Sequence, residues 1–138
     1  MKKNIVIIAV LTAALIAAYI IINNNRVDTS KLHGTWFCTI EQKNPTARLL
    51  YFNDSGKICL NIMMSMSHGC TGNDSTIGSY SVSGDIINVK YTQAFGDYID
   101  DSYTFKVNKL DSNRLKFYIL DETTKADSVL YQCEKVSE

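Results

Sequence analysis

The sequence predicts an all-β fold, an eight-stranded antiparallel up-and-down barrel, preceded by one N-terminal transmembrane helix. Three observations support this prediction. An uncharged, mostly apolar run extends over Ile5–Ile22. From Thr35 onward, short apolar and β-branched stretches alternate with clusters of Asp, Asn, Gly and Ser, and none keeps a helical period over three turns. These clusters have the composition of tight hairpin turns, which favour pairing between strands that are neighbours in the sequence.

The composition limits the class of protein. The chain has 138 residues, of which 46% are hydrophobic, and its 14 basic residues balance its 14 acidic ones. A disordered chain has fewer apolar residues and a larger net charge. A nucleic-acid-binding protein usually carries a basic excess, so we expect no nucleic acid among the partners. At this length one folded domain is expected.

Residues 1–22 are predicted to form a membrane anchor, or uncleaved signal. As a helix, Ile5–Ile22 spans about 27 Å, close to the thickness of the hydrocarbon core. Lys2 and Lys3 precede the run, which places the N-terminus in the cytoplasm and the rest outside. A cleaved signal peptide is the alternative, but its apolar core is shorter and ends in small residues. Both interpretations export the remainder, to the periplasm if the source is a Gram-negative bacterium.

The polar segment 23–30 is predicted to be a tether, and the barrel domain is expected over 31–138. Eight strands are predicted in it: Thr35–Glu41, Thr46–Asn53, Lys57–Met63, Thr76–Ser83, Asp85–Thr92, Ser102–Leu110, Arg114–Asp121 and Asp127–Val136. Alternation places Ile87, Val89 and Tyr91 on one face, as in a sheet with one buried side. An open meander leaves two exposed edges, and closure into a barrel removes them.

Three segments of the chain resemble a known family. Leu32–Trp36, Leu-His-Gly-Thr-Trp, resembles the Gly-x-Trp opening of the lipocalin and calycin group. Gly78–Val82 and Asp111–Phe117 resemble strands of compact bacterial lipocalin-like domains. The resemblance implies that Gly34 and Trp36 begin the first strand and that the Trp closes the narrow end of the barrel.

This resemblance covers about 31–136. The longer vertebrate-type members also carry a late Arg over the Trp and a C-terminal helix. In this sequence Lys135 is the only basic residue of the last predicted strand, and we expect no such helix within the residues given.

Four cysteines lie beyond the apolar run, and an even number in an exported domain indicates two disulfides. The sequence alone leaves three pairings open. If the barrel closes, Cys38 on the first strand and Cys133 on the last lie on adjacent strands, where a disulfide is feasible. Cys59 on the third strand and Cys70 in the loop after it are then the expected second pair.

The loop after the third predicted strand contains Met64, Met66, His68 and Cys70. Thioether, imidazole and thiolate groups are the soft ligands that suit Cu(I). The competing interpretation is stronger, because an oxidised Cys70 is not a ligand and methionines also serve as soft packing. We therefore expect no cofactor and keep copper binding as the weaker alternative.

The sequence contains no complete catalytic constellation. Two histidines exclude a three-His zinc site within one chain, and no nucleophile elbow or phosphate-binding loop occurs. We therefore predict a non-enzymatic, membrane-anchored binding module for a small apolar ligand or a protein partner. The alternative is an envelope protein inhibitor or stress partner that acts through its loops. A hollow barrel favours the ligand, and a filled one favours the protein partner.

Overall fold

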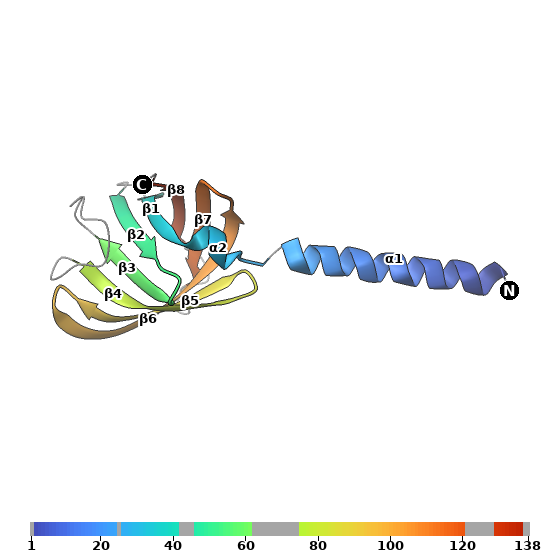
Figure 1. Cartoon of the computed structure of the whole chain (residues 1–138), viewed down its shortest axis with the longest axis horizontal. Coiled ribbons are helices and arrows are strands. Elements are labelled where there is room, and N and C mark those ends of the chain that lie inside the picture. Colours follow the sequence, from blue (N-terminus) through green and yellow to red (C-terminus); the bar gives the residue numbers. More distant parts are fainter. Residues whose placement is uncertain (1, 25, 42–45, 62–74, 121–128, 137–138) are drawn as a thin grey trace.

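The computed structural model describes residues 2–24, 26–41, 46–61, 75–120 and 129–136. Within these ranges, two helices precede eight strands (Figure 1). Their bounds are α1 Lys2–Asn24, α2 Thr29–Leu32, β1 Gly34–Ile40, β2 Thr46–Phe52, β3 Lys57–Asn61, β4 Ser75–Ser83, β5 Ile86–Ala94, β6 Asp97–Leu110, β7 Arg114–Leu120 and β8 Val129–Lys135.

The eight strands form one closed antiparallel barrel in sequence order. Each strand pairs with the next, and β1 closes the sheet by pairing with β8, with Cys38 opposite Cys133 in the register. The predicted eight-stranded up-and-down barrel is therefore confirmed. Closure leaves neither β1 nor β8 as a free sheet edge.

Alternation along the strands determines which side chains enter the barrel. On β5, Ile87, Val89 and Tyr91 are buried, whereas Asn88 and Lys90 between them are exposed. The same alternation on the other strands builds a single core of buried side chains: Leu32, Trp36, Cys38, Leu50, Phe52, Ile58, Ile87, Val89, Tyr91, Phe105, Leu115, Phe117 and Cys133.

Strand β6 is longer than the sequence predicts. It begins at Asp97 rather than at Ser102, because Ala94 pairs with Asp97 across the turn at Phe95 and Gly96. Two features hide this early start from the sequence. A register shift between Tyr91 and Gln93 breaks the simple alternation on β5, and the acidic residues at the start of β6 have low strand propensity. Pairing of β6 with β7 starts only at Thr104. Residues 97–103 therefore extend one wall beyond the described end of β7.

The segment before β1 is packed more closely than the predicted tether over 23–30. The Val27 amide donates to the Gly84 carbonyl at 2.8 Å, and the Asp28 carboxylate caps α2 by accepting from the Ser30 amide. Leu32, at the end of α2, is completely buried. The prediction missed this helix because four residues are too short for a visible period. The packed domain thus begins at Val27.

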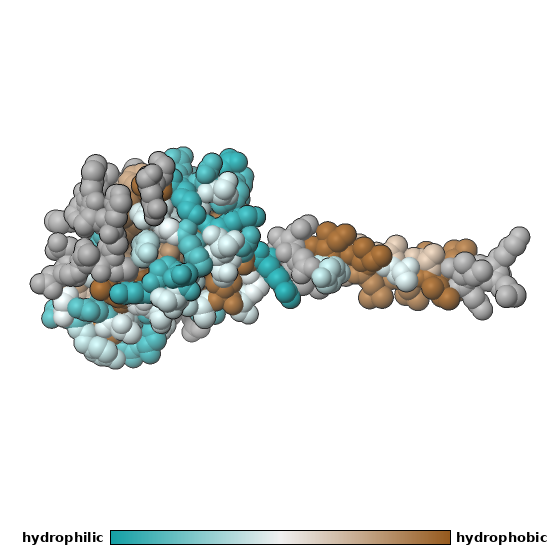
Figure 2. All heavy atoms as spheres, in the orientation of Figure 1, coloured by the Kyte–Doolittle hydropathy of each residue, from teal (hydrophilic) through white to brown (hydrophobic). Residues whose placement is uncertain are grey.

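Helix α1 projects away from the barrel (Figure 1), and its described side chains are mostly apolar and exposed (Figure 2). In the described part of the chain, no helix combines the length and the apolar character needed to cross a membrane. The predicted transmembrane anchor over Ile5–Ile22 is therefore not supported.

Candidate ligand-binding cavity

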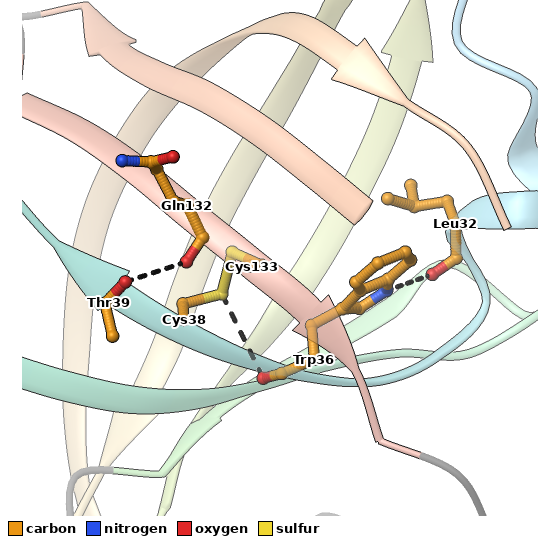
Figure 3. Close-up of a disulfide and its surroundings, with 6 residues drawn as sticks. All are labelled: Leu32, Trp36, Cys38, Thr39, Gln132 and Cys133. Carbon is orange, nitrogen blue, oxygen red and sulfur yellow. Dashed lines mark hydrogen bonds between the residues drawn. A yellow bond between two sulfur atoms is a disulfide. The ribbon is translucent and has the colours of Figure 1, made fainter. Parts of the chain in front are cut away.

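Trp36 closes one end of the barrel. Its side chain is 0% exposed, and its indole Nε1 donates to the Leu32 carbonyl at 2.7 Å, which ties β1 to α2 (Figure 3). The Lys135 ammonium lies 5.1 Å from the centroid of the Trp36 ring and donates to the Lys31 carbonyl. Lys135 thus lies over the Trp36 ring, in the position where the longer vertebrate-type lipocalins carry an Arg. The expected burial of Trp36 is found.

A disulfide joins Cys38 and Cys133 across the seam between β1 and β8, with their Cα atoms 4.0 Å apart (Figure 3). This is the pairing predicted from barrel closure. Cys59 on β3 is also disulfide-bonded, and the described part of the chain contains no free cysteine. Cys70, the predicted partner of Cys59, lies outside the described residues.

The barrel encloses a cavity of about 280 Å³ at the end opposite Trp36, lined by residues from all eight strands. Small-molecule sites typically measure about 300–1,000 Å³, so this cavity suits a small ligand. Its apolar lining residues are Leu50, Leu60, Ala94, Ile99, Phe105, Phe117 and Ile119. The cavity therefore resembles a typical ligand site, in which an apolar lining surrounds a few polar groups.

Three tyrosines supply hydroxyl groups to the lining: Tyr91, Tyr103 and Tyr131. The Tyr91 and Tyr103 rings meet edge to face at 5.8 Å, and Phe117 stacks on Tyr131 at 4.8 Å. Among the described residues, no hydrogen-bond partner is found for these three hydroxyl groups. Each hydroxyl group can donate a hydrogen bond to a molecule bound in the cavity.

Burial raises the pKa of the Tyr91 hydroxyl well above its usual range, and the phenols of Tyr131 and Tyr103 raise it further. Burial also raises the pKa of Tyr131, while the positive charge of Arg48 partly offsets this rise. Both hydroxyl groups therefore stay protonated, and act as hydrogen-bond donors, through the neutral pH range.

The raised pKa of Tyr91 predicts a loss of stability at alkaline pH. The unfolded chain releases the phenol proton near pH 10, whereas the folded protein retains it. The stabilisation is therefore fully present below about pH 10 and is lost as pH rises toward the folded pKa. We expect Tyr91→Phe to flatten the fall in unfolding free energy above pH 10, measured by urea titration. Equal slopes in the two proteins would contradict the burial of this hydroxyl. Tyr98→Phe, at an 81% exposed position, is the control.

Two charged residues also line the cavity, Arg48 on β2 and Asp101 on β6. These strands lie on opposite walls, because four strand positions separate them around the barrel. Neither residue was predicted from the sequence to line the barrel interior. Arg48 shares the inward alternation of Leu50 and Phe52, and that signal could have identified it.

A second, larger hollow of about 600 Å³ lies over β4, β5, β6 and the end of β7. Exposed polar residues form much of its lining: Ser79, Ser81, Asn88, Lys90 and Ser102. Because these side chains alternate with the buried ones, they face outward from the barrel. An open polar surface gives an apolar ligand little burial, so the interior cavity is the better candidate site.

The soft-ligand set proposed for copper, Met64, Met66, His68 and Cys70, lies outside the described residues. Within the described part of the chain, His, Cys, Asp and Glu form no group of three or more that could hold a metal ion.

No protein-family model matches the chain, and no curated protein matches it. Among solved structures, it is similar to a lipocalin-like protein from Bacteroides uniformis, at 16% sequence identity and a TM-score of 0.49. That similarity covers 77% of this chain and 99% of the other. The chain has a lipocalin-like fold, because its eight strands form a closed up-and-down barrel and β1 begins with a Gly-x-Trp whose Trp36 is fully buried.

Proposed function

We propose that this protein is a non-enzymatic binding module that holds one small apolar ligand inside its barrel. The observation that carries the proposal is the cavity of about 280 Å³. A barrel of this size can be filled completely by its own side chains, and a filled interior would instead favour a partner bound at the surface. The apolar lining supplies burial for the ligand, and the few polar groups orient it.

Binding of a neutral fluorescent probe, N-phenyl-1-naphthylamine, to the full chain tests this function. We expect probe emission to rise on binding, and Ala94→Phe to weaken probe binding about tenfold or more, because a closely packed site cannot absorb the added ring. Ala94 lines the cavity.

The matched control is Ala47→Phe. Ala47 precedes the inward-facing Arg48 on β2, so it faces outward. Equal probe binding by Ala94→Phe, Ala47→Phe and the natural sequence would contradict a ligand site in the cavity.

A second candidate function is that of an envelope protein inhibitor or stress partner acting through its loops. It is favoured by two exposed aromatic side chains at the β5–β6 turn, Phe95 (52% exposed) and Tyr98 (81% exposed). Phe95 also has a φ of +52°, which a bulky residue rarely adopts. A photo-reactive group at position 98 tests it, with one at exposed Ser112 as the control. A single protein cross-linked from position 98, and not from position 112, is the result that this candidate requires.

We further propose that the barrel works outside the cytoplasm. The Cys38–Cys133 disulfide and the bonded state of Cys59 support this location, because structural disulfides persist mainly in oxidising compartments. Alkylation of acid-quenched cells tests the proposal. We expect no alkylated cysteine unless a reductant is added first, and reduced cysteines in untreated cells would contradict it.

A further inference from the structure

The cavity lining contains a charged residue, Arg48, that a purely apolar ligand would not require. Arg48 points into the barrel from β2, opposite Cys38 in the β1–β2 register. Its Nη1 donates to the neighbouring Ala47 carbonyl at 3.0 Å. A guanidinium has five N–H donors, so most of those in Arg48 have no hydrogen-bond partner within the described part of the chain.

Among the described residues, Arg48 takes part in no ion pair. A charge facing an apolar interior is costly unless it is paired and hydrogen-bonded. A neutral side chain of similar length would fill the same space without that cost. Because none of the described residues forms an ion pair with the guanidinium, we explain its charge by an anion that enters the cavity with the ligand.

The surroundings of Arg48 favour an anion. Arg48 and Tyr131 both line the cavity, from the two strands that flank β1. Burial raises the pKa of the Tyr131 phenol, and the charge of Arg48 partly lowers it. Both are donors, and the hydroxyl has no hydrogen-bond partner among the described residues. Two donors close together can hold the oxygens of one carboxylate, and hydrogen bonds to ionised groups are about twice as strong as neutral ones.

The rest of the cavity determines the shape of the ligand. Leu50, Leu60 and Phe117 line the same cavity as the charged group and offer only apolar surface. Asp101, the other charged lining residue, is exposed and stands on the opposite wall, on β6. Its carboxylate repels an anion, so a negative head group is directed toward Arg48.

We propose that the cavity binds a single-headed anionic amphiphile, whose carboxylate contacts Arg48 and Tyr131 and whose apolar tail fills the barrel. This inference rests on the proposed function and narrows it from an apolar ligand to an apolar acid.

Three probes of equal chain length test it by displacing N-phenyl-1-naphthylamine from the full chain: decanoate, 1-decanol and decyltrimethylammonium, each below its micelle concentration. We expect decanoate to bind about tenfold or more tightly than decanol, because the alcohol carries no negative charge and offers the guanidinium one oxygen in place of two. The ammonium probe is expected to bind most weakly, since it meets the guanidinium.

Arg48→Gln is expected to weaken decanoate binding about tenfold or more and to weaken decanol binding by much less, so that the preference for decanoate is lost. Arg48→Lys keeps the charge but loses the planar fork, so we expect an intermediate loss. Tyr131→Phe removes one hydroxyl donor and is expected to cost about two- to tenfold. Arg114→Gln, at a mostly exposed arginine of β7, is the matched control and should change nothing.

The outcomes separate this inference from the proposed function. If decanoate and decanol bind equally and Arg48→Gln affects neither, the anionic head group is wrong while the apolar site stands. If the ammonium probe binds best and Asp101→Asn abolishes its binding, the cavity selects a cation and the inference is overturned. If no probe binds the natural sequence, the proposed function itself fails. Retained decanol binding by Arg48→Gln shows that the variant is folded.

Discussion

Trp36→Ala is expected to lower the unfolding free energy by about 3–5 kcal/mol, the usual cost of emptying a buried aromatic site. The side chain is fully buried, and its indole donates to the Leu32 carbonyl. The variant therefore loses both packing and a buried hydrogen bond. Urea unfolding followed by far-ultraviolet circular dichroism measures the change, because Trp36 is the only tryptophan and its removal ends tryptophan fluorescence.

Two further variants separate the contributions at this end of the barrel. Trp36→Phe keeps most of the ring burial but loses the bond to Leu32, so we expect about half the effect of the alanine variant. Lys135→Met keeps an apolar stem beneath the ring and removes the cation, for an expected cost of about 0.5–1 kcal/mol. A loss below about 1 kcal/mol for Trp36→Ala would contradict the closure of the barrel by this side chain.

The barrel could be predicted from the sequence because its signals are local. Alternation on β5, with Ile87, Val89 and Tyr91 inward, identifies a buried face without knowledge of any partner strand. Turn residues such as Gly84 mark the hairpins, where its φ of +63° suits glycine. Closure of the barrel could be predicted because an open sheet would leave two exposed edges. The Cys38–Cys133 disulfide joins the first and last strands, as closure requires.

The parts that could not be predicted depend on contacts between distant segments. The first residues of β6, from Asp97, have poor strand propensity and are ordered by pairing with the end of β5. Helix α2 is too short to show a period, and its stability comes from the Asp28 cap and from the burial of Leu32. The sequence shows Lys135 on the last strand but not its contact with Trp36, because that contact depends on the β1–β8 register.

The candidate site was predictable only in outline. A hollow interior depends on the summed volumes of side chains from eight strands, which alternation along any one strand does not reveal. Arg48 was overlooked because a charged residue is normally assigned to the solvent face, although its position between inward neighbours pointed the other way. Charged residues on the inward alternation of a predicted barrel strand are therefore candidates for ligand contacts.

Removal of the Cys38–Cys133 disulfide is expected to have the second large effect. The bridge joins residues 95 positions apart, and cross-linking a loop of about 100 residues stabilises by about 4.7 kcal/mol in the chain-entropy model. It also fastens β1 to β8, the seam that closes the barrel. We expect the Cys38→Ala, Cys133→Ala double variant to lose about 3–5 kcal/mol in urea unfolding.

The matched comparison is the Cys59→Ala, Cys70→Ala double variant, which removes the predicted second pair. That pair encloses only about a dozen residues, so its expected contribution is smaller, about 3 kcal/mol. Non-reducing peptide mapping of the natural sequence should find Cys38 linked to Cys133. A Cys38–Cys59 linkage would contradict the adjacency of β1 and β8. If the two double variants lose equal stability, the length of the enclosed loop is not what determines the effect. The contribution of the β1–β8 bridge would then lie in native packing around two sulfur atoms that are both buried in the core.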